Sequence, residues 1–187
     1  EARVCVVGLG YVGLPFAVEK AKVGFNVTGI DQNARRVQQV NAGESYVTDV
    51  PGSELQRLVK KSLIKAVADF TPVAAADVIV ICVPTPLTQN QVPDLQYVIN
   101  VTEEIAKHLR PGQLISLEST TYPGTTEEVL LPLLQSSGLK IDEDYFLCHS
   151  PERVDPGNKR YTTKNPNKVV GGAGPHSLEV AQTFYEQ

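Results

Sequence analysis

Residues 3–16 read RVCVVGLGYVGLPF, and this stretch predicts the fold. It begins with a short apolar run rich in β-branched side chains, which is typical of a buried strand. Glycines then follow at the spacing G-x-G-x-x-G, at Gly8, Gly10 and Gly13. Pro15 suits the first turn of a helix, because the N–H that proline lacks has no partner there. The stretch therefore predicts a strand, a tight glycine turn and a helix.

Each glycine of this turn has its own expected role. Gly8 permits the turn, Gly10 lets a pyrophosphate approach the backbone because it has no Cβ, and Gly13 lets the helix pack closely on the strand. The free N–H groups and the positive dipole end of the helix favour an anion. Glycine turns are common, so the pattern indicates a dinucleotide site only in this strand–turn–helix context.

A second apolar run, residues 25–30, ends at Asp31. An acidic side chain about 20 residues after the glycine turn is expected to bind the ribose hydroxyls of an adenosine. Its charge also repels the 2′-phosphate of NADP, although Arg35 and Arg36 lie close enough to weaken that repulsion. Asp31 therefore favours NAD. The alternative interpretation is that Asp31 is the N-cap of a helix that begins near Asn33.

Composition limits the possible partners of the chain. It has 187 residues, of which 42% are hydrophobic, with a net charge of −4 and a pI near 5.4. These values argue against nucleic acid or an anionic membrane as the main partner. The sequence shows neither an apolar run of membrane-spanning length nor a secretory signal, so we expect a cytoplasmic location. The cysteines Cys5, Cys82 and Cys148 lie in apolar runs without zinc-site spacing, so we expect buried, reduced thiols and no metal.

Strand-like runs alternate with helical segments along the chain, which predicts an α/β fold with a doubly wound parallel sheet of the Rossmann type. Capping-box spacing at Ser53 and at Thr125 predicts two of the helix starts. We expect residues 1–174 to form the nucleotide-binding domain and residues 175–187 to begin a linker helix toward a further domain. Parallel strands are expected at residues 3–7, 25–30, 64–68, 77–83, 113–118 and 145–149, with a short returning strand at 168–172.

Ligands in such sheets bind beyond the carboxyl ends of the strands, where polar, Gly and Pro residues cluster in this sequence. Turn chemistry alone explains part of that clustering. Thr85 and Ser119 are predicted to reach a cofactor through hydroxyl or backbone groups. Thr120 and Glu152 lie further round the sheet and are expected to face the nicotinamide end, where a proton must leave the alcohol as its hydride is transferred. The alternative for Glu152 is a helix- or turn-capping carboxylate paired with Arg153 or with a nearby lysine.

Five motifs follow one another along the chain: the glycine turn through Pro15, Asp31 with Arg36, residues 82–86 (CVPTP), residues 118–125 (ESTTYPGT) and residues 150–153 (SPER). Through these motifs the chain resembles, over essentially its whole length, the amino-terminal domain of the UDP-sugar 6-dehydrogenases. Residues 150–159 are most similar to the branch of this family that acts on UDP-N-acetylglucosamine. The UDP-glucose branch carries a glutamate where this chain has Pro156.

The resemblance implies a four-electron oxidation of the C6 alcohol of a UDP-sugar to the uronic acid, in which two NAD are reduced. The aldehyde is trapped by a cysteine of a later domain, whose motif does not occur in this sequence. We therefore expect the chain to bind NAD without completing turnover, and the full-length protein to be a homodimer through the missing central domain.

The same resemblance assigns roles to individual residues of the chain. It implies that Thr120 and Glu152 position a water and handle protons, and that the loop after Glu152 touches the sugar. The residues that it implies for NAD binding are Gly8, Gly10, Tyr11, Val12, Gly13, Asp31, Arg36, Val83, Pro84, Thr85, Ser119 and Thr120.

Alternative functions stay open at this point. The substrate could be UDP-glucose or UDP-N-acetylmannosamine, and the chain could be a non-catalytic NAD-binding module that senses nucleotides. A 2-hydroxy-acid or phosphogluconate type dehydrogenase would share the glycine turn. That last alternative does not account for the segments around Thr120 and Glu152.

Overall fold

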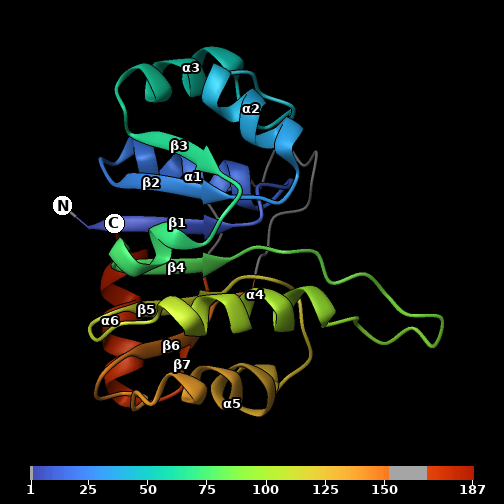
Figure 1. Ribbon diagram of the computed structural model, residues 1–187, viewed down its shortest axis with the longest axis vertical. Coiled ribbons are helices and arrows are strands. Elements are labelled where there is room, and N and C mark those ends of the chain that lie inside the picture. The colour runs from blue at the N-terminus through green and yellow to red at the C-terminus, as the bar shows by residue number, and fades with distance from the viewer. Residues whose placement is uncertain (1, 152–167) are drawn as a thin grey trace.

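The computed structural model describes residues 2–151 and 168–187. These residues form one seven-stranded sheet in the order β3-β2-β1-β4-β5-β6-β7. Every neighbouring pair is parallel except β6 and β7. The carboxyl ends of the parallel strands therefore lie along one edge (Figure 1). The strands are β1 (Arg3–Val7), β2 (Asn26–Ile30), β3 (Ile64–Val67), β4 (Val78–Ile81), β5 (Leu114–Leu117), β6 (Phe146–His149) and β7 (Gly171–Gly172).

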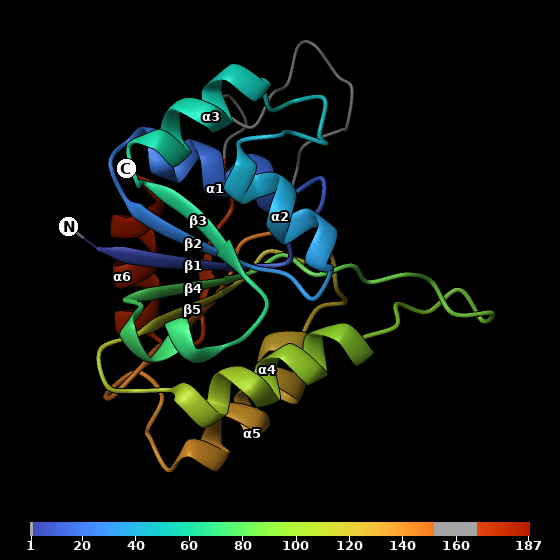
Figure 2. The same cartoon turned by 45° about the horizontal axis from the view of Figure 1, so that its top comes forward.

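Helices cover both faces of the sheet, with α1 and α6 on one face and α4 and α5 on the other (Figure 2). Alternate residues of β1 enter two separate apolar clusters, Val4 and Val6 on the side of α1 and Cys5 and Val7 on the side of α4. This arrangement confirms the doubly wound sheet. The helical elements are α1 (Gly13–Lys22), α2 (Ala34–Ala42), α3 (Gly52–Lys60), η1 (Thr71–Ala75), α4 (Gln96–His108), η2 (Thr126–Leu130), α5 (Leu131–Leu134), η3 (Gln135–Ser137) and α6 (Pro175–Tyr185).

The two predicted capping boxes do not form. Pro51, with its fixed φ of −61° and extended ψ, is the N-cap of α3, so Ser53 lies inside the helix and its hydroxyl caps nothing. The hydroxyl of Thr125 instead donates to the Tyr122 carbonyl at 2.7 Å. The chain then makes one turn of π-helix, η2, before α5 begins. At α3, the extended backbone of Pro51 takes the N-cap position that was predicted for Ser53. At η2, Thr125 already has helical φ and ψ, and its hydroxyl is used by the Tyr122 carbonyl.

Helix α6 packs on the sheet through buried Ala181 and Phe184. Its first turn is tied to β6, because the Leu147 N–H donates to the Ser177 hydroxyl at 3.2 Å. Its last turn is held by Lys20, whose Nζ donates to the Phe184 carbonyl at 2.8 Å and lies 4.2 Å from the centre of the Phe184 ring. Burial is the main reason that the pKa of Lys20 falls to about 8. Whether residues 175–187 lead into a further domain stays a prediction.

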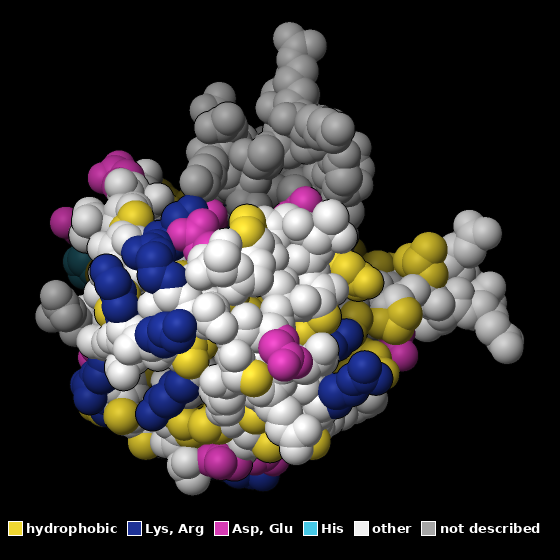
Figure 3. All heavy atoms as spheres, turned by 90° about the horizontal axis from the view of Figure 1, so that it is seen from above, with side chains coloured by type: hydrophobic (Ala, Val, Ile, Leu, Met, Phe, Trp, Pro, Cys, Tyr) yellow, Lys and Arg dark blue, Asp and Glu magenta, His cyan; other side chains and the backbone are white. Residues whose placement is uncertain are grey.

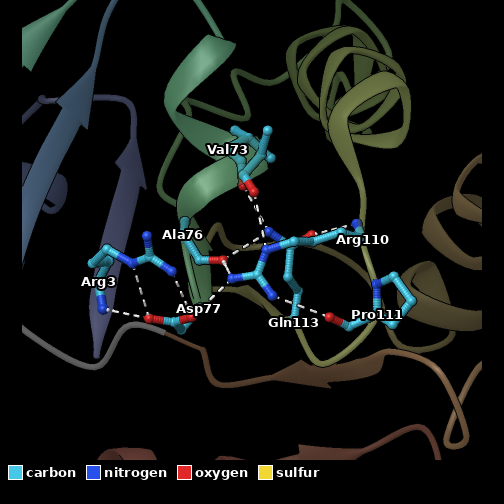
Figure 4. A network of polar contacts seen from close by, with 8 residues as sticks. Arg3, Val73, Ala76, Asp77, Arg110, Pro111 and Gln113 are labelled. Atoms are coloured by element: carbon cyan, nitrogen blue, oxygen red, sulfur yellow. Dashed lines mark hydrogen bonds and ion pairs between the residues drawn. The ribbon is translucent and has the colours of Figure 1, made fainter. Parts of the chain in front are cut away.

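The amino ends of the central strands are joined by a polar network, shown in Figure 4. Asp77 accepts a hydrogen bond from Arg110 Nη2 at 2.8 Å. Gln113 is fully buried, and its Nε2 donates to the carbonyls of Val73 at 2.6 Å and Ala76 at 2.8 Å. Its Oε1 accepts from the Arg110 N–H at 2.7 Å. The network fixes where β4 and β5 begin, and thereby where their carboxyl ends lie.

The surface of the molecule carries both signs of charge. Figure 3 looks from above on the end formed by α2 and α3, where Lys and Arg side chains gather on one side with acidic and neutral side chains beside them. Within residues 2–151 and 168–187, no helix combines the length and the apolar character that crossing a membrane requires.

Gln113→Leu tests the network at the amino ends of the strands. We expect it to lower the free energy of unfolding by about 2–4 kcal/mol, because leucine cannot replace the three hydrogen bonds that the fully buried Gln113 side chain makes. Urea denaturation measures the change. Gln38→Leu, at an exposed position of α2, is the matched control and should change stability by less than about 0.5 kcal/mol. Equal effects of the two substitutions would argue against a stabilising role for Gln113.

Candidate cofactor site

A cavity of about 560 Å³ lies along the carboxyl ends of β1, β2, β4 and β5. Its walls come from the glycine turn, the segments that follow β2, β4 and β5, and the first turns of α4. This volume is in the usual range for cofactor and ligand sites. The predicted cofactor-binding residues that line it are Gly8, Gly10, Tyr11, Val12, Asp31, Arg36, Val83, Pro84, Thr85, Ser119 and Thr120.

The three glycines of the turn differ in what surrounds them. Gly8 has φ of +91°, and a Cβ there would lie 2.6 Å from the Cys82 carbonyl oxygen. A Cβ on Gly13 would lie 1.8 Å from the Gly8 oxygen, so this residue serves the packing of α1 on the turn and does not line the cavity. A Cβ on Gly10 would meet no atom within 4 Å, although Gly10 is part of the cavity wall. The surroundings of Gly8 and Gly13 agree with their expected roles in the turn and in helix packing, whereas the role of Gly10 toward a pyrophosphate stays a prediction.

Asp31 joins the glycine turn to the start of α2. Its Oδ2 accepts from the Leu9 N–H at 2.9 Å and lies 3.3 Å from Arg36 Nη1, while its Oδ1 accepts from the Asn33 N–H at 2.8 Å. Only 9% of the residue is exposed. The N-cap of α2 is Asn33, whose Oδ1 accepts from the N–H groups of Arg35 and Arg36. The alternative interpretation of Asp31 as that N-cap is therefore wrong.

Two hydroxyl groups connect the segments that follow β4 and β5. Thr85 Oγ1 donates to the Thr120 carbonyl at 2.6 Å, and Ser119 Oγ donates to the Val83 carbonyl at 2.7 Å. Both hydroxyl hydrogens are thus used within the protein, which leaves oxygen lone pairs and backbone groups to meet a cofactor. These bonds hold the backbone of Thr120 at the edge of the cavity.

Buried polar atoms gather just beyond β5 and β6, next to Thr120. Thr121 Oγ1, His149 Nε2 and Ser150 Oγ are buried and have no hydrogen-bond partner among the described residues. Burial lowers the pKa of His149 from its usual value and thereby favours the neutral imidazole. Unpaired buried polar groups are rare in folded proteins and are typical of functional sites. Glu152, the predicted catalytic carboxylate, lies outside the described residues.

Glu118 was part of a sequence motif but had no predicted role. The structure buries it completely and places its Oε2 2.6 Å from Lys168 Nζ, while its Oε1 accepts from the Tyr185 hydroxyl. That hydroxyl also lies 2.6 Å from the Ser116 oxygen. Glu118 thereby links the end of β5, two residues before Thr120, to α6 and to the segment that enters β7.

Sequence reasoning missed the contribution of α4 to the cavity. One face of this helix belongs to the apolar core, where Val98 and Ile105 are fully buried. However, Tyr97, Asn100 and Val101 line the cavity as well. The topology could have predicted this contribution. A helix that follows the segment after β4 starts at the carboxyl ends of the strands, where ligands bind.

The cysteines behave as expected from their apolar surroundings. Cys5, Cys82 and Cys148 are free and buried. Burial raises the pKa of the Cys5 and Cys148 thiols to about 12, so neither forms the thiolate that a nucleophile requires. The part of the chain that the structure describes contains no cluster of three His, Cys, Asp or Glu side chains suited to a metal ion.

The strand order, the glycine turn and the acidic residue at the end of β2 together define a Rossmann-type dinucleotide-binding domain. The chain belongs to the UDP-glucose/GDP-mannose dehydrogenase family, whose NAD binding domain matches residues 2–187. This match confirms the family that the sequence motifs predicted, and it confirms NAD as the cofactor of this domain.

Individual relatives agree with the family match. The chain is 37% identical to UDP-N-acetyl-D-glucosamine 6-dehydrogenase of Pseudomonas aeruginosa, over 100% of this chain and 44% of the relative. It is 36% identical to UDP-N-acetyl-D-mannosamine dehydrogenase of Methanocaldococcus jannaschii, over 98% and 42%. A ternary complex of GDP-mannose dehydrogenase from Pseudomonas aeruginosa superposes with a TM-score of 0.92 at 28% identity, over 98% of this chain and 44% of that one. The chain thus spans less than half the length of these relatives.

Gly10→Ala tests where the dinucleotide binds. We expect NAD affinity to fall at least about tenfold, because the added methyl group occupies space through which the pyrophosphate approaches the backbone. Thermal stability should change little, since the methyl meets no protein atom within 4 Å. Calorimetric titration with NAD and thermal melting measure the two effects. Gly52→Ala in α3, where the space is equally open, is the control, and equal NAD affinity of the two variants would contradict the assigned position.

Proposed function

We propose that the protein oxidises the C6 alcohol of a UDP-hexose to the uronic acid with NAD, and that its substrate is UDP-N-acetylglucosamine. The observation that carries the proposal is a cavity lined by the glycine turn and Asp31 at one end and by Thr120 at the other, in a chain of this dehydrogenase family. The substrate follows from the resemblance of residues 150–159, and the UDP-N-acetyl-D-glucosamine relative supports it.

The residues of this chain suit the binding of NAD across the sheet. The turn around Gly10 would receive the pyrophosphate, and Asp31 would accept hydrogen bonds from the adenosine ribose. The nicotinamide would then lie toward Thr120, because β4 and β5 follow β1 in the sheet. Bound there, NAD supplies the hydride acceptor for the alcohol and again for the aldehyde stage.

The proton chemistry is proposed for Thr120 and Glu152. As the hydride leaves C6, the proton on the alcohol oxygen must pass to a base, and a water held by these two side chains suits that step. The bond from Thr85 to the Thr120 carbonyl keeps the segment that carries this hydroxyl in place. The cysteine that traps the aldehyde is proposed to belong to a later domain, which would also form the homodimer.

Two other substrates and one non-catalytic role can be distinguished from the proposed function. UDP-N-acetylmannosamine is supported by a relative of nearly equal identity, so the choice between the two N-acetyl sugars rests on residues 150–159. UDP-glucose is disfavoured by Pro156. A non-catalytic NAD-binding module would bind NAD without oxidising a UDP-sugar.

The three buried, free cysteines fit the reducing conditions of the cytoplasm, where we place the protein.

NADH absorbance tests the proposal directly. The full-length protein, mixed with NAD and one UDP-sugar at a time, should form two NADH per UDP-N-acetylglucosamine and have its highest kcat/KM with that sugar. The 187-residue chain alone should bind NAD without steady turnover. A higher kcat/KM with UDP-N-acetylmannosamine would overturn the substrate and keep the reaction class. NADH formation with none of the sugars would favour the binding module.

Asp31→Asn tests the proposed adenosine end. Removing the charge should weaken NAD about tenfold, because ribose hydroxyls bind more strongly to a carboxylate than to an amide. The preference for NAD over NADP should also shrink, since the repulsion of the 2′-phosphate is lost. Calorimetric titrations with both cofactors measure the ratio. Asp49→Asn, at an exposed position, is the matched control, and an unchanged ratio in Asp31→Asn would contradict this role.

A further inference from the structure

Tyr46 reaches the glycine turn from the connection between α2 and α3. Its hydroxyl donates to the Leu9 carbonyl at 2.7 Å, across 37 positions of sequence. The sequence motifs gave this tyrosine no role. It is partly buried and lines a smaller cavity of about 270 Å³ that shares Gly10 and Arg36 with the cofactor cavity.

Both backbone polar groups of Leu9 are hydrogen-bonded, and its side chain is buried. Its N–H donates to Asp31 and its carbonyl accepts from Tyr46. Its side chain is fully buried against Gly29, where an added Cβ would lie 2.6 Å from the leucine methyl groups. Arg36 contacts both partners of Leu9. Its Nη1 lies 3.3 Å from Asp31 Oδ2, and its Cζ lies 5.9 Å from the centre of the Tyr46 ring. We call Asp31, Arg36 and Tyr46 the Leu9 clamp.

The Leu9 clamp has a consequence for the next residue, Gly10. The Leu9 carbonyl and the Gly10 N–H belong to one planar trans peptide, so they point in opposite directions. Fixing the carbonyl on Tyr46 therefore fixes the direction of the Gly10 N–H. Among the described residues this N–H donates no hydrogen bond, and Gly10 lies in the wall of the cofactor cavity.

We propose that Tyr46 is a positioning residue that aims the Gly10 N–H at the pyrophosphate of the bound dinucleotide. The inference rests on the proposed function, because it requires NAD in this cavity. Tyr46 touches neither the reacting atoms nor the sugar, and it acts only through the Leu9–Gly10 peptide. A preorganised N–H costs no reorganisation when the anion binds, so its contribution appears in affinity for the cofactor.

The surroundings of Tyr46 keep it a donor at working pH. Burial, and next the charge of Asp31, raise the pKa of Tyr46 to about 12, while Arg36 acts in the opposite direction. The phenol is therefore protonated throughout the neutral and mildly alkaline range. Deprotonation of Tyr46 therefore does not break its hydrogen bond to the Leu9 carbonyl at the pH of a binding experiment.

Tyr46→Phe removes the hydroxyl and keeps the ring beside Arg36. In the full-length protein we expect the Kd and the KM for NAD to rise about tenfold with kcat unchanged at saturating NAD, because one hydrogen bond that orders the turn is lost. ADP-ribose, which contains the pyrophosphate, should weaken by the same factor, whereas adenosine should bind as it does to the unchanged protein. Calorimetry and an NMR titration for the weak adenosine measure these values.

Tyr145→Phe is the matched control. Its hydroxyl is buried without a partner among the described residues and lies outside both cavities, so affinity for NAD should stay within about twofold. Melting temperatures of both variants report any loss of folding.

Three outcomes separate this inference from the proposed function. NAD binding that is equal in Tyr46→Phe and the unchanged protein would overturn the positioning role and leave the proposed function standing. Equal weakening of adenosine and ADP-ribose would overturn it as well, since the effect would then lie outside the pyrophosphate. Failure of the unchanged protein to bind NAD at all would overturn the proposed function itself.

Discussion

The hydrogen bond from the Leu9 N–H to the Asp31 carboxylate is the contact on which the rest of the site depends. It joins the turn after β1 to the end of β2 in a place where only 9% of the aspartate is exposed. The same carboxylate orders the start of α2 through the Asn33 N–H. One side chain thus sets the shape of the glycine turn and presents the acidic group beside it, so the positions that we propose for the phosphates and the ribose are linked by one carboxylate.

The features that the sequence predicted are those that local stereochemistry dictates. Gly8 adopts a positive φ, and Gly13 lies where a Cβ would overlap the Gly8 carbonyl, so no other residue type fits either position. The apolar run of β4 is buried along its whole length, as a central parallel strand requires. The glycine positions depend on backbone geometry within a few residues, and the apolar run of β4 depends on its place in the middle layer of the fold. Both features can therefore be predicted from the sequence without the tertiary structure.

The features that could not be predicted depend on where distant segments meet. Tyr46 acquires its partner only because the connection after α2 passes over the glycine turn. The hydroxyls of Thr85 and Ser119 are at the predicted edge, yet each bonds to a carbonyl of the neighbouring segment. The capping box at Ser53 failed because Pro51 starts the helix earlier. Spacing along the chain identifies which residues lie near the site, but hydrogen-bond direction is settled by packing.

The polar groups at the glycine turn and those beyond Thr120 differ in how they are paired. At the glycine-turn end, Asp31 and Leu9 have their polar groups paired by other residues of the chain. Beyond Thr120, outside the cavity wall, Thr121, His149 and Ser150 bury polar atoms without a partner among the described residues. The glycine-turn end of the cavity is thus ordered by contacts within the chain, which suits the cofactor position that we propose for it.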